Sequence, residues 1–181
     1  MDIATEPPPQ TLPAVTLPQI QPADAPILEK YFIVREVGRG AFSVVWEAYH
    51  KSTNQRYAIK SINKKYISKQ GWINLCREVE IMIHLNHPNI LRLHEYINTA
   101  THVHLILDYV DGGELFDQIV QRGNFGEKDA SAIVKQILSG IHYLHTNGVA
   151  HRDLKPENLL CCSDGRVVVA DFGLAKVFGR G

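Results

Sequence analysis

Two short polar segments near the end of the chain combine residue types that could carry out phosphate chemistry. His151–Asn158 reads HRDLKPEN and places an acid, a cation and a carboxamide in one loop. Asp171-Phe172-Gly173 follows the apolar run 167–170, which predicts a short strand. Carboxylate and amide oxygens are the hard ligands that Mg2+ prefers, and a further carboxylate can orient a hydroxyl that attacks a phosphate. The two segments therefore predict a site for a magnesium-bound phosphate.

Composition limits the kind of protein that carries this site. The chain has 181 residues, 45% of them hydrophobic, which is enough for one good core or two small lobes. Its 19 basic and 19 acidic residues give no net field that would favour nucleic acid or a membrane surface as a partner. The three cysteines form no CxxC pair, no apolar run could span a membrane, and the first residues are acidic where a signal peptide is basic. We expect a soluble protein of the cytoplasm or the nucleus.

The first part of the chain differs from the rest in composition. Most of the prolines fall between Pro7 and Pro26, in a stretch that has no aromatic residue and few charges. Proline fixes φ and lacks a backbone donor, so this density opposes both helix and sheet. We therefore expect residues 1–28 to form a disordered tail.

Runs rich in β-branched and aromatic residues predict an antiparallel sheet after this tail. The expected strands are Tyr31–Val37, Phe42–Tyr49, Arg56–Ile62, Leu91–Ile97 and His102–Tyr109. Between the first two strands, Gly38 and Gly40 allow the backbone N–H groups to approach a phosphate closely. Taken alone, a hairpin of this kind is usually only a turn.

Lys60 lies on the apolar side of the third expected strand and needs a counter-charge there. An unpaired buried ammonium is costly, whereas a solvated edge lysine is the simpler alternative. The following segment, 72–85, offers two acids on a predicted helix. At ~100° per residue, Glu78 falls on the buried flank and Glu80 points nearly opposite, so Glu78 is the predicted partner. The apolar stripe of this helix consists of Trp72, Leu75, Cys76, Val79, Met82 and Ile83.

Two more helices are expected, over 114–121 and 127–146. The longer one has an apolar side and ends at Asn147-Gly148, which is typical of a left-handed helix cap. Because the chain supplies no further helix to pack against it, we expect this apolar side to be partly exposed. Its members are Ala130, Ile133, Val134, Ile137, Leu138, Ile141 and Leu144.

In this order and at these spacings, the motifs resemble those of eukaryotic protein kinases. HRDLKPEN matches the catalytic-loop pattern H-R-D-L-x-x-x-N at each fixed position, 171–173 matches D-F-G, and Tyr57–Lys60 is similar to V-A-I-K. The loop 38–45 resembles G-x-G-x-x-G-x-V, with Ser43 in place of the third glycine. The resemblance covers Tyr31–Gly181. Its details are similar to serine/threonine kinases of the calcium/calmodulin-dependent group, through Lys155-Pro-Glu-Asn and Asp111-Gly-Gly-Glu-Leu-Phe.

This resemblance implies an α+β fold of the kinase type. A small lobe over about 31–107 would hold a five-stranded antiparallel sheet and one regulatory helix, a hinge would span about 108–113, and the first, mainly helical part of a large lobe would cover about 114–181. ATP and Mg2+ would be the cofactors. The catalytic residues would be Asp153, Lys155, Lys60 and Glu78, and the magnesium ligands Asn158 and Asp171. Contacts to ATP would come from Val37, Gly38, Arg39, Gly40, Ala41, Phe42, Ser43, Val44, Val45, Ala58, Lys60, Leu107, Asp108, Val110, Glu114 and Leu160.

The function implied is phosphoryl transfer from ATP to Ser or Thr hydroxyls of protein substrates. Because the match stops shortly after D-F-G, the alternative is a catalytically inactive fragment that binds nucleotide or a partner protein. A calmodulin-binding segment would have to lie outside this chain. Glu114 and Glu157 border the expected substrate groove, where such acids receive an arginine in basophilic kinases, so substrates should have a basic context. The alternative for Glu114 is a contact with the ribose and the helix dipole.

Overall fold

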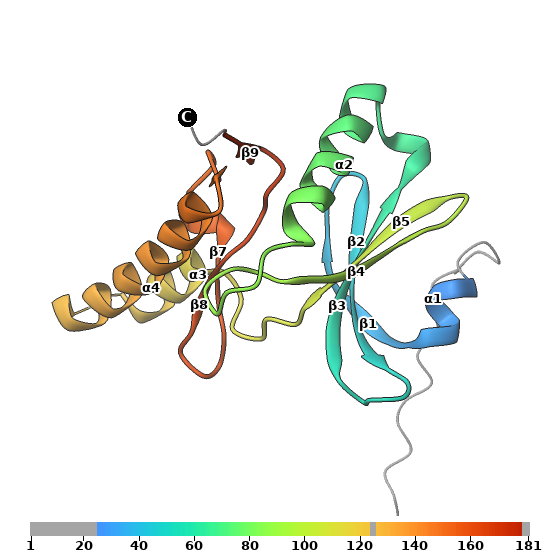
Figure 1. Cartoon of the computed structure of the whole chain (residues 1–181). Helices are drawn as coiled ribbons and strands as arrows, with labels where there is room; N and C mark the ends of the chain where they lie inside the picture. The colour runs from blue at the N-terminus through green and yellow to red at the C-terminus, as the bar shows by residue number, and fades with distance from the viewer. Residues whose placement is uncertain (1–24, 124–125, 179–181) are drawn as a thin grey trace, which may run out of the picture.

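Five antiparallel strands form the first half of the protein, in a computed structural model that describes residues 25–123 and 126–178 (Figure 1). The sheet order is β1-β2-β3-β5-β4, so β5 lies between β3 and β4. The predicted sheet is confirmed, with strand ends shifted by one or two residues. The strands are β1 Tyr31–Arg39, β2 Ser43–His50, β3 Arg56–Asn63, β4 Leu93–Asn98 and β5 His102–Asp108.

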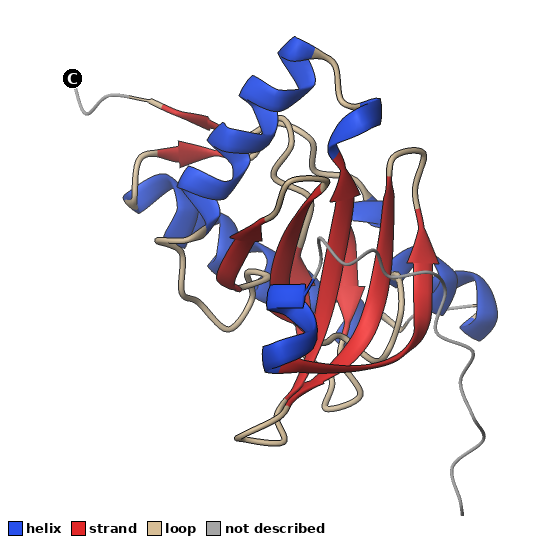
Figure 2. Cartoon of the chain, turned by 90° about the vertical axis from the view of Figure 1, so that its right-hand side faces the viewer, coloured by secondary structure: helices blue, strands red, loops and turns tan. Residues whose placement is uncertain are grey.

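Each face of the sheet packs against a different set of residues. Along β3, Ile62 belongs to the main core, whereas Ile59 lies fully buried in a smaller cluster on the outer face. Helix α1, Ala25–Lys30, covers that outer face, as Figure 2 shows, and buries Ile27 in the cluster. The prediction of a disordered tail is therefore wrong for residues 25–28, because one apolar anchor is enough to dock a helical turn. Residues 1–24 lie outside the described part of the chain.

Helix α2, Lys69–Met82, lies on the other side of the sheet from α1 (Figure 1). Ser68 caps it by accepting a hydrogen bond from Gly71 N at 3.0 Å. The helix starts and ends three residues before the predicted 72–85. Only part of the predicted apolar stripe is buried: Leu75 and Met82 reach the core, while Trp72, Cys76 and Ile83 are exposed. Trp72 and Cys76 line a hollow of about 230 Å3 between α2 and strands β4 and β5, which accounts for their exposure.

The second half is mainly helical and also contains two small two-stranded sheets, the β7–β8 hairpin and the pair of β6 with β9. Helix α4 has the predicted bounds and is closed by Gly148, whose φ of 72° is the left-handed conformation that glycine adopts readily. Helix α3 begins one residue later than predicted, because Glu114 has extended backbone angles and precedes the first turn. The elements are α3 Leu115–Arg122, α4 Glu127–Thr146, β6 Val149–Ala150, η3 Pro156–Asn158, β7 Leu159–Cys161, β8 Val167–Val169 and β9 Lys176–Val177.

The two halves share one continuous core. Leu91 N donates to Val169 O and Val169 N donates to Asn89 O, both at 2.9 Å, so the segment before β4 pairs with β8. Leu144 of α4 is fully buried against this core, but Val134 and Leu138 are exposed, as expected for the uncovered side of that helix. Across the described ranges, no helix combines the length and the apolar character needed to cross a membrane.

Candidate functional site

The glycine-rich segment forms an open turn between β1 and β2. Gly40 N donates to Ser43 O at 2.8 Å, which closes the turn, and residues 39–42 at its tip are exposed. A Cβ at Gly40 would lie 3.0 Å from Ser43 Oγ, so the serine hydroxyl occupies the space beside this glycine. Val45 pairs with Gly38 on one side and with Lys60 on the other. Strand β2 therefore connects the glycine-rich turn to Lys60, the residue predicted to contact the same phosphates.

A cavity of about 250 Å3 touches this turn from the outer face of the sheet. It lies between Trp46 and Tyr66 and is lined by no acid and no lysine. The groups that could handle a phosphate converge instead on the opposite, inner face. We therefore locate the candidate site by its converging side chains and not by this cavity.

Lys60 and Glu78 approach each other within the small lobe. Glu78 lies on the inward side of α2, whereas Glu80 is exposed, in agreement with the predicted choice between them. Burial is the main cause of a raised pKa for Glu78; the charge of Lys60 opposes the rise and the charge of Asp171 adds to it. Neither a hydrogen bond nor an ion pair within 4 Å joins Lys60 to Glu78 in the part that the structure describes. The two charges therefore act on each other at longer range.

The polar loop 151–158 is organised by contacts among its own side chains. Asp153 Oδ2 accepts from Lys155 Nζ at 2.9 Å and from Asn158 Nδ2 at 3.0 Å. Asn158 Nδ2 also donates to Asp153 O at 2.8 Å. The hydrogen bond from Lys155 is the main reason that the pKa of Asp153 lies below its ordinary value. The loop thus presents an ionised carboxylate whose direction is fixed by a cation and an amide.

Two buried rings fix this loop against the segment that carries Asp171. His151 Nε2 donates to Ala170 O at 2.9 Å, and its ring meets the ring of Phe172 edge-on, with 4.9 Å between centroids. Ala170 N donates in turn to Asn158 O at 2.8 Å. Asp171 has a φ of 60°, a conformation that non-glycine residues adopt mainly under local constraint, and it is exposed. The predicted metal ligands, Asn158 and Asp171, are thereby brought to adjoining backbone segments.

Asp171 links the two halves of the candidate site electrostatically. Its negative charge contributes to the raised pKa of Glu78 on α2 and also to that of Lys155, for which the hydrogen bond to Asp153 is the largest cause. Charges separated by water are screened within about 10 Å. A Cβ placed on Gly173 would lie 3.2 Å from Asp171 Oδ1 and 3.9 Å from Glu78 Oε2, so both carboxylates border the same small space. Asp171 therefore lies close to Glu78 on α2, and its charge also reaches Lys155 in the polar loop.

The segment between β5 and α3 is hydrogen-bonded to both halves of the protein. Asp108 N donates to Arg92 O at 3.1 Å on the sheet side. On the other side, Gly112 N donates to Cys161 O and Cys161 N donates to Gly113 O, both at 2.8 Å. A Cβ at Gly112 would lie 2.4 Å from Cys161 O, so this close approach requires glycine. The segment occupies the position predicted for a hinge.

Four of the predicted nucleotide contacts are apolar side chains that belong to the main core or lie at its margin. Ala58, Val110 and Leu160 all pack partly buried at the margin of the main core, and Leu107 is buried behind them. Within the described ranges, no protein group accepts a hydrogen bond from Val110 N. Partly buried apolar side chains and a backbone N–H with no acceptor among the described residues suit a flat heterocycle with an acceptor on its edge.

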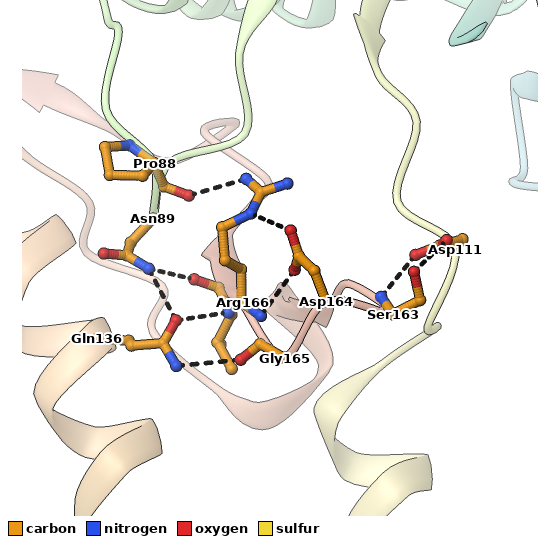
Figure 3. Close-up of polar contacts among 9 residues, drawn as sticks. Pro88, Asn89, Asp111, Gln136, Ser163, Asp164, Gly165 and Arg166 are labelled. Carbon is orange, nitrogen blue, oxygen red and sulfur yellow. Dashed lines mark hydrogen bonds and ion pairs between the residues drawn. The ribbon is translucent and has the colours of Figure 1, made fainter.

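Figure 3 shows that Asp111, in the segment before α3, is hydrogen-bonded to Ser163 in the turn between β7 and β8. The Asp111 carboxylate accepts from Ser163 N and Ser163 Oγ, both at 2.7 Å, and these bonds lower the pKa of Asp111. Gln136 on α4 accepts from Val167 N at 2.9 Å and donates to Gly165 O at 3.1 Å. The turn is thus tied both to the hinge and to α4.

Asn158 and Asp171 offer oxygen atoms suited to Mg2+. Because Asn158 Nδ2 is used in bonds to Asp153, the carboxamide oxygen is the atom left for a cation, and the Asp171 carboxylate is accessible. Mg2+ usually takes one or two protein ligands and completes its shell with water and phosphate oxygens. The residues with described positions include no cluster of three His, Cys, Asp or Glu side chains that could hold a metal alone. The donor set fits a cation that binds together with phosphates.

Reasoning from the sequence missed the residues that hold the site in place. Asp111 and Ser163 lie 52 positions apart, and no local pattern relates them. The bond from His151 to Ala170 is likewise a contact between distant segments. Only the polar character of Asp111 beside two glycines indicated a turn there, which says nothing about its partner.

Comparison with known proteins extends this picture. A family model described as the protein kinase domain matches residues 31–181. A probable myosin light chain kinase of Dictyostelium discoideum is 51% identical over 166 residues, which are 90% of this chain and 52% of that protein. The calcium/calmodulin-dependent protein kinase type II of Caenorhabditis briggsae is 49% identical over 150 residues, 81% of this chain and 28% of that protein. The chain spans about half the length, or less, of the curated relatives it matches.

The opposite orientations of Glu78 and Glu80 give a direct test. Lys60→Met should weaken the binding of Mg-ADP because it removes a positive charge next to the predicted phosphate site, and Glu78→Gln should weaken it because it removes the predicted counter-charge that orients Lys60. Glu80→Gln is the matched control and should bind Mg-ADP as the wild type does. Isothermal titration calorimetry measures all three, and a larger loss for Glu80→Gln than for Glu78→Gln would show that the assignment of the helix face is wrong.

Proposed function

Because the chain belongs to the protein kinase domain family, we propose that it binds Mg-ATP between its two halves and supplies groups that transfer the γ-phosphoryl to a serine or threonine hydroxyl of a protein. The observation that carries this proposal is the convergence of Asp153, Lys155, Asn158 and Asp171 in one constellation with Lys60 and Glu78. Phosphoryl transfer depends mainly on positioning and on compensating negative charge. These residues offer both.

Each residue has a distinct part in the proposed reaction. Asp153 is held ionised by Lys155, so it accepts a hydrogen bond from the substrate hydroxyl and orients that oxygen toward the phosphorus. Lys155 stabilises the negative charge that spreads over the transferring group. Asn158 and Asp171 would hold the magnesium, which would offset negative charge on the phosphates. Lys60 contacts the phosphates on the small-lobe side, with Glu78 as its counter-charge.

A substitution at Asp153 tests the reaction itself. In the protein that contains this chain, Asp153→Asn should lower kcat by about 10^2- to 10^4-fold, the range for loss of a positioned proton acceptor. The KM for ATP should stay within about threefold of the wild-type value, because Asp153 does not contact the nucleotide. Transfer of labelled phosphate to a serine peptide measures both quantities.

Asp164→Asn is the control for that experiment, because it makes the same chemical change in an exposed acid of the β7–β8 turn. Undiminished transfer by Asp153→Asn would contradict the proposed role. Nucleotide binding without any transfer by the unaltered protein would favour the alternative of a non-catalytic nucleotide-binding module.

Two acids near the polar loop also indicate which residues a substrate should have around its phosphorylated serine or threonine. Glu114 precedes α3 without a side-chain capping bond, and Glu157 is exposed in η3, against which α3 packs. Among the described residues, neither carboxylate has a hydrogen-bond or ion-pair partner. Two such acids near the polar loop suit an arginine, whose planar guanidinium can bridge carboxylates with charge-assisted bonds. We therefore expect a preference for arginine three residues before the phosphorylated serine or threonine.

Replacing one of these acids tests the preference. Glu114→Gln should reduce the advantage of an arginine peptide over its alanine counterpart in kcat/KM by about 10- to 100-fold, the equivalent of roughly 1.5–3 kcal/mol for one charged hydrogen bond. Glu127→Gln, at the start of α4, changes a comparable acid elsewhere and should preserve the advantage. A peptide array that shows no gain from this arginine in the unaltered protein would rule out the preference.

A further inference from the structure

A buried carboxylate on β2 gathers two arginines next to the hinge. Glu47 is only 4% exposed although it is charged. Arg56 on β3 binds Glu47 Oε1 through Nη2 at 2.7 Å and Nε at 2.8 Å, and Arg35 on β1 binds Oε2 through Nε at 2.8 Å. A carboxylate withdrawn from water requires charged donors of this kind. Glu47 therefore holds the guanidinium groups of Arg35 and Arg56 in place.

These arginines hold the ring of Tyr109. The guanidinium carbon of Arg56 lies 3.7 Å from the centre of the Tyr109 ring, so the cation is stacked on the face of the ring. Arg35 Nη2 donates to Tyr109 Oη at 3.4 Å, and that hydroxyl lies 3.5 Å from Glu47 Oε2. The ring is thus contacted on its face and at its hydroxyl by residues from three strands.

Tyr109 stands between the two hinge residues whose backbone is predicted to meet a nucleotide base. On one side, Asp108 is itself fixed, because His94 Nε2 contacts its Oδ1 at 2.6 Å and its N–H donates to Arg92 O at 3.1 Å. On the other side is Val110, whose N–H has no acceptor among the residues with described positions. The side chains of Asp108 and Tyr109 are both directed into anchoring contacts, which leaves the backbone as the surface for a ligand.

We propose that Glu47, Arg56 and Tyr109 are positioning residues for the adenine ring of ATP, which they do not touch. They hold the hinge backbone so that Val110 N is fixed relative to β3 before the nucleotide binds. The inference rests on the proposed function, because it requires a nucleotide between the two halves. A preset donor lowers the ordering cost of binding. Among the described residues, none of the three forms a hydrogen bond or ion pair with the phosphate-handling groups, so their effect falls on nucleotide affinity and not on the transfer step.

Two substitutions test this role in the complete protein. Arg56→Lys keeps a positive charge beside Glu47 but loses the planar group that stacks on the ring, and Tyr109→Leu keeps an apolar side chain but loses the ring. Each should raise the KM for ATP by about tenfold, the size expected for loss of a partly desolvated cation–π contact. The KM for the peptide substrate and the kcat at saturating ATP should change by less than about twofold.

Arg166→Lys is the matched control, since it makes the same change in an arginine that pairs with Asp164 at 2.7 Å but stacks on no ring. Its KM for ATP should equal that of the wild type. A wild-type KM for ATP in both hinge variants would overturn the proposal. The proposal would also be overturned if kcat fell in these variants and their unfolding temperature, measured in the absence of nucleotide, fell as well. That combination indicates that the cluster only stabilises the fold. A wild-type protein that binds no Mg-ATP would instead refute the proposed function on which this role rests.

Discussion

The partial burial of one carboxylate, Glu78, is the constraint on which the arrangement of this protein depends. Its surroundings favour the neutral form, the charge of Lys60 favours the ionised form, and the charge of Asp171 opposes ionisation again. These three groups come from α2, β3 and the segment after β8. The state of Glu78 therefore depends on how the helix, the sheet and the second half of the chain are placed relative to one another. A cation or a phosphate that enters between them would change this balance.

The rest of the fold fixes the distances among these groups. The pairing of Leu91 and Asn89 with Val169 joins the small lobe to the strand that leads to Asp171. The hinge is held by Gly112 and Cys161 at one end and by the stacking of Arg56 on Tyr109 at the other. Phosphoryl transfer needs groups that are already in place when the substrate binds. The backbone hydrogen bonds between the two halves meet that requirement, because they fix the segments that carry the charged side chains.

Much of this could be predicted from the sequence, for reasons that differ between elements. The strands and α4 are set by local periodicity, which is why their predicted bounds are close to those observed. The inward position of Glu78 and the exposure of Glu80 needed only the geometry of a helix, whereas the pairing of Glu78 with Lys60 stays a prediction. The burial of Ile27 in α1 and the exposure of Trp72 and Cys76 could not be foreseen, because each depends on the shape of a distant surface. The cluster around Glu47 escaped prediction for the same reason: alternation alone does not show which arginine a buried acid will meet.

The pH dependence of stability tests the central claim about Glu78 most directly. Its raised pKa means that the folded state holds more protons than the unfolded state, so this residue's contribution to stability is present at low pH and is lost as pH rises through the folded pKa. The free energy of unfolding of the wild type, measured by chemical denaturation from about pH 4 to about pH 8, should therefore fall relative to that of Glu78→Gln as pH rises. A difference between the two proteins that stays constant, or that changes in the opposite direction, would contradict the claim that burial controls this carboxylate.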